Sequence, residues 1–264
     1  MGRLNDKVVI VTGGAAGIGE AAVRIFVAEG AKVAIADVQD DLGADLEKEL
    51  GDRVVFLHTD TGQSDDVREL VDNTVDHFGR LDSMFNNAAV IRDGWRIADH
   101  PEDAYDLQMA INVKGPWLGM KYGIAQMLKN EKGGSIVNTA SLAGLQGNSG
   151  HSAYGASKGA VISLTRHAAI EYAHENIRVN CVCPSGTLTP NVFSRRPGVP
   201  REEVEAQFAN TNPMRRGIRA EDVAHGALWL LSDDAAMVNG VVLPIDGGRS
   251  ASSYGGPTPD SRLH

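Results

Sequence analysis

The sequence predicts a single α/β domain built as a three-layer, doubly wound parallel sheet with helices on both faces. Short runs rich in valine and isoleucine alternate along the chain with longer segments of helical periodicity. These runs are apolar throughout instead of alternating apolar and polar residues, which is typical of strands that are buried on both faces of a parallel sheet.

The expected strands and helices follow each other in a regular order. One helix is expected to begin near Glu20, and another runs from Ser64, which is followed by two aspartates, to Phe78 before Gly79. The expected strands are residues 8–11, 32–36, 54–58, 84–86, 135–139, 178–183 and 241–244.

No repeat and no linker rich in glycine, serine or proline divides this series, so residues 1–249 are expected to form one catalytic domain. Apolar residues among polar ones and prolines predict a mobile substrate lid at about residues 189–214. Residues 250–264 are small and polar and contain two prolines; we expect a C-terminal tail that is either disordered or ordered by a neighbouring subunit.

Composition excludes several classes of function. The formal net charge of -9 comes without a basic run, so neither nucleic acid nor an anionic membrane surface is an expected partner. No apolar stretch approaches the roughly 20 residues that cross a bilayer, and no signal peptide is recognisable, so we expect a soluble, cytoplasmic protein. Cys181 and Cys183 alternate in an apolar run, which predicts inert core thiols, and no residues have metal-ligand spacing.

A glycine-rich turn, TGGAAGIG at residues 12–19, joins the first expected strand to the first helix. Glycines let backbone N–H groups approach an anion, and the positive end of the helix points to the same place. Gly13, Gly17 and Gly19 therefore predict a pyrophosphate site, with Ile18 packed inward. The alternative is a tight strand-to-helix turn without a ligand.

The second expected strand ends at Asp37, where a carboxylate can accept both hydroxyls of an adenosine ribose. This aspartate would repel a 2′-phosphate, and Ala15, Ala16 and Val38 offer no counter-charge. The expected cofactor is therefore NAD rather than NADP. The alternative for Asp37 is a solvated aspartate that starts the next helix and binds no ligand.

Polar and small residues follow the third and fourth expected strands. Asp60 and Thr61 come after the third strand, and Asn87 and Ala88 come after the fourth. Because ligands sit beyond the carboxyl ends of parallel strands, these residues are expected to line the same crevice as the glycines.

Tyr154 and Lys158 are four residues apart, on one face of an expected helix. A phenol is a poor base at neutral pH unless a neighbouring positive charge lowers its pKa. Lys158, helped by the positive nicotinamide ring of the expected cofactor, is expected to do so. Ser141 follows the fifth strand on the crevice side and can bond a substrate oxygen, and Asn112 completes a candidate set. The alternative is an ordinary pair on a surface helix.

The chain resembles the short-chain dehydrogenase/reductase family over residues 7–248. The resemblance is carried jointly by TGxxxGxG, Asp37, NNAA, Asn112, Ser141, YxxxK and a distal proline turn. The resemblance implies a Rossmann-like subunit with a seven-stranded sheet, usually in a homotetramer, that catalyses reversible hydride transfer between a nicotinamide cofactor and a carbonyl or alcohol carbon.

The resemblance also implies a role for each residue that matches. Tyr154 would be the acid/base, Lys158 would lower its pKa and hold the nicotinamide ribose, and Ser141 would stabilise the substrate oxygen. Asn112 would anchor a water that links Lys158 to solvent. Pro184, Thr187 and Thr189 are expected beside the nicotinamide.

Two positions depart from the pattern of the family. Ala89 stands where the family commonly has glycine, and Ser185 stands where glycine usually follows Pro184. The second departure affects the backbone near the nicotinamide, and neither changes the expected class of reaction.

The expected substrate is an apolar secondary alcohol or ketone, including cyclic alcohols of terpenoid or steroid type. The candidate pocket residues are Trp95, Leu142, His151, Val192 and Phe193. For each of them the alternative is packing within the lid or exposure to solvent. A carbonyl or 3-oxoacyl-thioester reductase is an alternative, as is a dinucleotide-binding redox sensor. Asp37 disfavours the first and the catalytic set disfavours the second.

Overall fold

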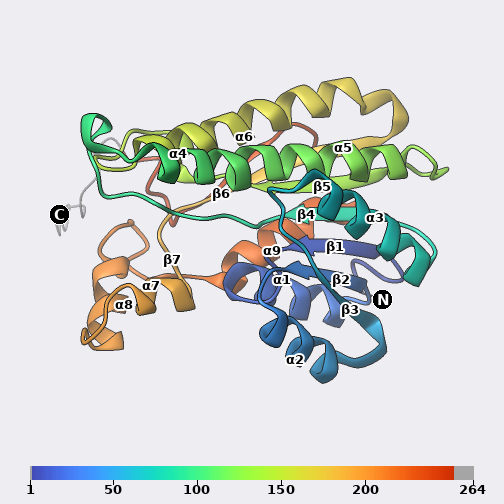
Figure 1. Cartoon of the computed structure of the whole chain (residues 1–264), viewed down its shortest axis with the longest axis horizontal. Helices are drawn as coiled ribbons and strands as arrows, with labels where there is room; N and C mark the ends of the chain where they lie inside the picture. The colour runs from blue at the N-terminus through green and yellow to red at the C-terminus, as the bar shows by residue number, and fades with distance from the viewer. Residues whose placement is uncertain (1, 253–264) are drawn as a thin grey trace, which may run out of the picture.

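The computed structural model describes residues 2–252 and shows a central parallel sheet between two layers of helices (Figure 1). The sheet has seven strands in the order β3-β2-β1-β4-β5-β6-β9. The order reverses beside β1, so a crevice opens at the carboxyl ends of β1 and β4. The strands are β1 (Val8–Thr12), β2 (Lys32–Asp37), β3 (Val54–His58), β4 (Ser83–Asn86), β5 (Gly134–Thr139), β6 (Ile177–Pro184) and β9 (Val242–Ile245).

Each layer of helices covers one face of the sheet. One layer holds α1 (Gly17–Ala28), α2 (Asp40–Leu50) and α9 (Ala220–Leu231), and the other holds α3 (Ser64–Phe78), α4 (Glu102–Met109), α5 (Gly115–Met127) and α6 (Ser152–Glu171). Phe26 of α1 packs on Phe85 of β4 with ring centroids 6.2 Å apart, while Met84 faces the cluster with α3, α5 and α6. Burial of apolar side chains on both faces stabilises this arrangement.

The ends of the helices follow local signals, with one correction. Helix α3 begins at Ser64 and ends at Phe78, and the N–H of Gly79 bonds the carbonyl of Val75 at 2.7 Å, which confirms the expected cap. Helix α1 begins at Gly17 instead of near Glu20. The last glycines of the turn are therefore already helical, and their N–H groups form the positive end of α1.

Short elements connect the main ones. They are η1 (Gly51–Arg53), η2 (Ile97–Asp99), the π-helix η3 (Ala110–Lys114), η4 (Leu142–Gly144), η5 (Ala173–Glu175) and η6 (Asp233–Ala235). The segment after β6 holds β7 (Thr187–Leu188), α7 (Pro190–Ser194), α8 (Arg201–Ala209) and β8 (Ile218–Arg219), where β7 pairs with β8 in a second sheet. Helices α7 and α8 lie at one end of the molecule, away from the three layers (Figure 1).

Two further features bear on the expectations from composition. Cys181 and Cys183 are both free and fully buried on β6, in a cluster with Val161 and Ile162. Within residues 2–252, no helix is long and apolar enough to cross a membrane, and no cluster of three potential ligands could hold a metal ion. The predicted tail lies, from residue 253 onward, outside the described residues.

Candidate active site

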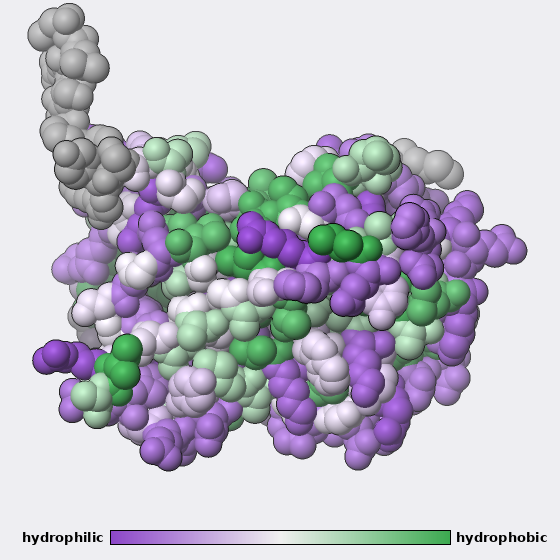
Figure 2. Space-filling model, turned by 90° about the horizontal axis from the view of Figure 1, so that it is seen from above, coloured by the Kyte–Doolittle hydropathy of each residue, from purple (hydrophilic) through white to green (hydrophobic). Residues whose placement is uncertain are grey.

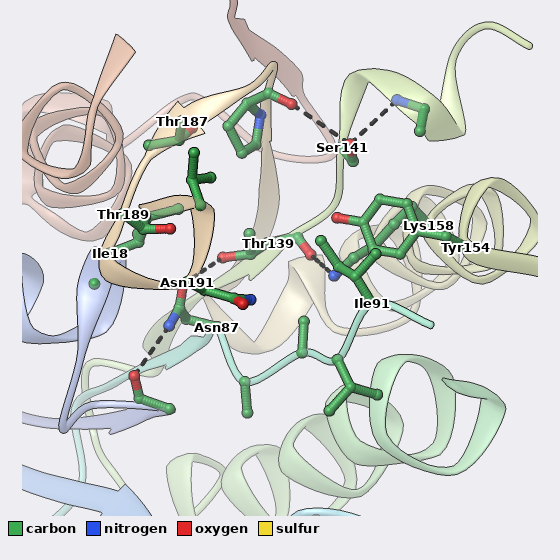
Figure 3. A pocket seen from close by; sticks show the side chains of 18 of the residues that line it. Ile18, Asn87, Ile91, Thr139, Ser141, Tyr154, Lys158, Thr187, Thr189 and Asn191 are labelled. Carbon is green, nitrogen blue, oxygen red and sulfur yellow. Dashed lines mark hydrogen bonds between the residues drawn. The ribbon is translucent and has the colours of Figure 1, made fainter. Parts of the chain in front are cut away.

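A cavity of about 1060 Å³ opens at the carboxyl ends of the strands, between the sheet and the segment that holds α7 and α8 (Figure 3). This volume is at the upper end of the range for ligand pockets, roughly 300–1,000 Å³. Most of the predicted site residues line it together. They are Gly13, Gly17, Ile18, Asp37, Asp60, Thr61, Asn87, Ala88, Ser141, Leu142, His151, Tyr154, Lys158, Pro184, Thr187, Thr189 and Val192.

The three glycines of the turn have different structural roles. Gly13 and Gly17 have φ values of +63° and +59°, a region that favours glycine. Gly19 is required by close packing instead, because a Cβ there would lie 1.9 Å from the carbonyl oxygen of Gly13. The turn therefore brings the backbone of α1 directly against the end of β1.

The first turn of α1 is suited to an anion. No side chain caps this helix, so the N–H groups of its first turn, from Gly17 to Gly19, lack an intrahelical partner, and Gly17 and Ile18 line the cavity. Unpaired N–H groups and the positive end of the helix dipole together bind phosphate. Ile18 both lines the cavity and packs against the core beneath α1. The turn therefore fits the pyrophosphate of a dinucleotide.

Asp37 is held rigidly at the end of β2. Its carboxylate accepts the N–H groups of Ala15, Val38 and Gln39 at 3.0, 2.8 and 3.1 Å, and the residue is 7% exposed. It also lines the cavity. Residues 12–19 and 37–39 contain no lysine or arginine.

Arg24 lies in an adjoining pocket beside Gln39. Its guanidinium bonds Glu20 at 3.0 Å and Glu49 at 2.6 Å. These two carboxylates raise the pKa of Arg24 above its ordinary value. The two carboxylates offset the positive charge of Arg24, which makes it a weaker partner for a 2′-phosphate.

The loop after β4 is bound to the end of β1 by a threonine that sequence reasoning missed. The Thr12 hydroxyl accepts the N–H groups of Asn87 and Ala88 at 3.0 and 3.1 Å, and the Asn87 amide donates to the Thr12 carbonyl at 3.1 Å. Thr12 begins the quoted turn, but nothing in the sequence shows which strand its side chain meets. These bonds position Asn87 and Ala88 in the cavity wall.

Ser141, Tyr154 and Lys158 lie on one side of the cavity (Figure 3). Ser141 caps η4, where its hydroxyl oxygen accepts the N–H of Ala143 at 3.1 Å. Lys158 is one turn after Tyr154 on α6, and its Nζ lies 5.8 Å from the Tyr154 ring centroid. Lys158 Nζ donates to the carbonyl of Thr139 at 2.7 Å. Hydroxyl, phenol and ammonium therefore face the same space.

Burial dominates the electrostatics of this group. It raises the pKa of Tyr154 to about 12, and a hydrogen bond with Ser141 opposes that shift. Tyr154 is therefore protonated at neutral pH in this structure. Burial also lowers the pKa of Lys158 to about 8. A lowering of the Tyr154 pKa by Lys158 and the positive nicotinamide together stays a prediction for the cofactor-bound protein.

Asn112 lies behind the cavity wall and is fully buried in η3. Its amide accepts the N–H of Val90 at 2.8 Å and donates to the carbonyl of Val90 at 2.8 Å. A further bond of 3.3 Å joins it to the Ser157 hydroxyl. Its side chain thus anchors the loop after β4, and a role in holding a water beside Lys158 stays a prediction.

Two candidate pocket residues lie outside the cavity lining. Trp95 is 38% exposed and packs edge-on against His100 with ring centroids 5.3 Å apart. Phe193 packs instead under the guanidinium of Arg201, 4.7 Å from its ring centroid. The cavity wall includes Asp93 and Phe208, which the sequence did not single out because their positions depend on how distant loops fold.

Comparisons with known proteins agree with this geometry. A family model described as Enoyl-(Acyl carrier protein) reductase matches residues 13–250. The chain is 40% identical over 259 residues to momilactone A synthase from Oryza sativa subsp. japonica, covering 96% of this chain and 94% of that protein.

Two further similarities cover almost the whole length of both partners. The 2,5-dichloro-2,5-cyclohexadiene-1,4-diol dehydrogenase of Sphingobium indicum is 40% identical, over 95% of this chain and 100% of its own. The crystal structure of levodione reductase superimposes with a TM-score of 0.88 at 33% identity, over 95% of this chain and 100% of that one.

Proposed function

Because the chain belongs to the short-chain dehydrogenase/reductase family, we propose that it is an NAD-dependent oxidoreductase that interconverts a secondary alcohol and a ketone. The family uses a nicotinamide dinucleotide, and the similar proteins are named as dehydrogenases and reductases. The observation that carries the proposal is the convergence of Ser141, Tyr154 and Lys158 with the glycine turn in one cavity.

The bound nicotinamide supplies the redox step by exchanging a hydride with the substrate carbon. The residues of the chain orient the reactants and move the proton. The Ser141 hydroxyl donates to the substrate oxygen, and Tyr154 exchanges a proton with the same oxygen. Since its pKa is about 12, Tyr154 is ready to protonate a ketone oxygen at neutral pH. For Tyr154 to act as a base toward an alcohol, positive charge beside the phenol, including that of Lys158, must lower its pKa.

The preference for NAD over NADP rests on Asp37. Its carboxylate is rigid, lines the cavity and stands where a ribose would lie. A 2′-phosphate at this position would be repelled by the carboxylate of Asp37. Residues 12–19 and 37–39 contain no lysine or arginine that could attract it, and Arg24 is paired with Glu20 and Glu49.

The shape of the cavity supports a ring-shaped secondary alcohol as substrate. Apolar side chains line it beside Ser141 and Tyr154, including Ile91, Leu142, Val192 and Phe208. The name of the Sphingobium indicum relative specifies a ring alcohol, a cyclohexadiene diol. We therefore propose cyclic alcohols as the substrate class, with a terpenoid or steroid-like alcohol as the larger candidates.

Two alternatives make different predictions. A carbonyl or 3-oxoacyl-thioester reductase would prefer NADPH, and the description of the matching family model keeps this reading open. The arginines that line the cavity each donate to a neutral oxygen: Arg195 to the Ile91 carbonyl, Arg196 to the Val192 carbonyl and Arg249 to the Ser185 hydroxyl. Their positive charge would suit a phosphate on a thioester carrier, so the cofactor preference and the substrate panel decide between the two readings. A redox sensor would bind the dinucleotide without needing Tyr154.

We also propose that the protein acts as a cytoplasmic homotetramer. Helices α4 to α6 and the residues next to them expose a group of apolar side chains, and the view onto this side shows apolar residues among polar ones (Figure 2). The members of this group are Tyr105, Leu107, Trp117, Leu128 and Ile170. Large exposed apolar side chains favour association with another subunit.

The direct test is to follow reduction of NAD⁺ and of NADP⁺ with cyclic, linear and steroid alcohols, together with reduction of an acetoacetyl thioester by NADPH. We expect turnover with NAD⁺ and cyclic alcohols. Asp37→Asn should lower the preference for NAD by about tenfold or more, because it removes the charge that repels a 2′-phosphate. Preference of the wild type for NADPH and the thioester would contradict the proposal.

A further inference from the structure

We propose that Asp93 and His151 form a polar subsite that binds a second hydroxyl of the substrate. This inference rests on the proposed function and narrows its substrate class from cyclic alcohols to cyclic diols. Both residues line the cavity together with Ser141 and Tyr154. Neither has a part in the proton transfer described above.

The first step of the argument is the position of His151. It precedes α6, and its ring centroid lies 6.5 Å from that of Tyr154. The His151 side chain is 43% exposed. A small ring whose reacting oxygen touches Tyr154 is thus within reach of His151.

The second step is the pairing of the two side chains. Asp93 Oδ2 lies 2.7 Å from His151 Nδ1, and the Asp93 side chain is only 14% exposed. Within residues 2–252 this oxygen forms no hydrogen bond of regular geometry, and His151 Nδ1 is the polar atom that lies close to it. Asp93 therefore orients the imidazole as a positioning residue.

The third step concerns the nitrogen that remains. A carboxylate beside Nδ1 favours the tautomer that carries its proton there, which leaves Nε2 as an acceptor in the neutral ring. The ring meets Asp93 through Nδ1, and Nε2 has no hydrogen-bond partner in the described part of the chain. An acceptor that lines a cavity selects a ligand hydroxyl, since an analogue without the hydroxyl leaves a polar atom unpaired.

The surroundings keep the pair in place. The loop of Asp93 is joined to the segment before α6 by a bond of 2.8 Å from the N–H of Gly94 to the carbonyl of Gly150. Arg195 approaches Asp93 Oδ1 at 4.0 Å and donates to the carbonyl of Ile91 at 2.5 Å. Three segments distant in sequence therefore meet at this subsite.

The test compares kcat/KM for cyclohexanol, 4-methylcyclohexanol and the isomeric cyclohexanediols with NAD⁺. The methyl compound matches the size of a diol without its second hydroxyl. A diol has two hydroxyls that can react, so its kcat/KM is divided by two before the comparison. At least one diol should then have a kcat/KM about tenfold above that of both monols, chiefly because its KM is lower. Equal values for diols and monols would overturn the proposal while leaving the proposed function intact.

Variants locate the effect. His151→Phe removes both ring nitrogens, whereas His151→Asn keeps a donor for Asp93 and, being shorter, has no acceptor at the position of Nε2. Both should bring the diol preference down to about one, and Asp93→Asn should lower it severalfold by releasing the ring. His167→Phe is the matched control on α6, because His167 is exposed and bonds the Ser163 carbonyl. An unchanged preference in His151→Asn would overturn the assignment.

A binding measurement separates the two proposals. Dissociation constants of the same alcohols for NAD-loaded Tyr154→Phe, measured by calorimetry, report the subsite without turnover. Tighter binding of a diol, by about tenfold, supports the subsite even if the wild type turns over no alcohol, a result that would refute the proposed function. Binding that does not distinguish diol from monol overturns the subsite.

Discussion

The cavity has two walls that are built differently. The sheet-side wall presents the glycine turn, Asp37, Ser141, Tyr154 and Lys158 from the ends of buried parallel strands and from the long helix α6. The lid-side wall, within the segment predicted as a lid, is formed by α7 and the residues next to it and by Phe208 of α8.

The contacts of the two walls differ as well. Lys158 is 1% exposed and Asp37 7% exposed, whereas Arg195 holds the lid from a side chain that is 43% exposed. Buried backbone contacts position groups rigidly, as proton transfer requires, while exposed side-chain contacts allow a wall to open for substrate. We therefore propose that the sheet side sets the reaction and that the lid side sets access and specificity.

Lys158→Met should have the largest effect, because it removes the ammonium beside Tyr154 from the rigid wall. We expect kcat/KM to fall by about 10²–10³-fold. Steady-state kinetics with NAD⁺ and a cyclic alcohol check this. A loss of only a few fold would mean that Lys158 serves packing and not catalysis.

The same variant tests how burial affects Lys158. Burial lowers its pKa from 10.5 to about 8, so between those values the unfolded chain binds more protons than the folded protein. The free energy of unfolding of the wild type should therefore rise between about pH 8 and 10.5, by up to about 3 kcal/mol, and the variant should lack this rise. Urea unfolding at several pH values measures the difference, and parallel curves would contradict it.

Gly19→Ala should have an intermediate effect, on cofactor binding. Its Cβ would overlap the carbonyl oxygen of Gly13, so the turn must move. We expect a loss of about 1–3 kcal/mol in unfolding free energy and at least about tenfold in NAD affinity, measured by fluorescence titration. Gly147→Ala is the control, because nothing lies within 4 Å of the added methyl. Equal affinity in the two variants would show that the turn tolerates a side chain.

Arg195→Gln should have the smallest effect, because it loosens only the lid. The variant loses the bond to the Ile91 carbonyl and the approach to Asp93. The KM for alcohol should rise a few fold, with a change in stability of about 0.5 kcal/mol or less. A collapse of activity as large as that of Lys158→Met would remove the distinction between the walls.

The sheet-side wall could be predicted from the sequence because its signals are local. Runs of apolar residues define strands, and a residue just after a strand must lie at the carboxyl edge of the sheet. The strands of the sheet therefore match the expected ones within one residue at each end. The glycines, Asp37 and the pair Tyr154 and Lys158 follow from position alone.

The remaining features depend on contacts between distant segments. Trp95 and Phe193 were reasonable pocket candidates by position, but their loops turn them toward His100 and Arg201. Asp93 meets His151 only after both loops fold. In the protein alone burial raises the pKa of Tyr154, and the extent of that burial is a property of the whole cavity; a lowered pKa with the cofactor bound stays a prediction.

The most direct test of the account is the initial rate of NADH formation from NAD⁺ and a cyclic secondary alcohol, for the wild type and for Tyr154→Phe. We expect turnover by the wild type and a rate lower by about 10²–10⁴-fold in the variant, with NAD still bound, because the phenol that exchanges the proton is gone. A variant that keeps the wild-type rate would show that the proton moves by another route and would contradict the assignment of Tyr154.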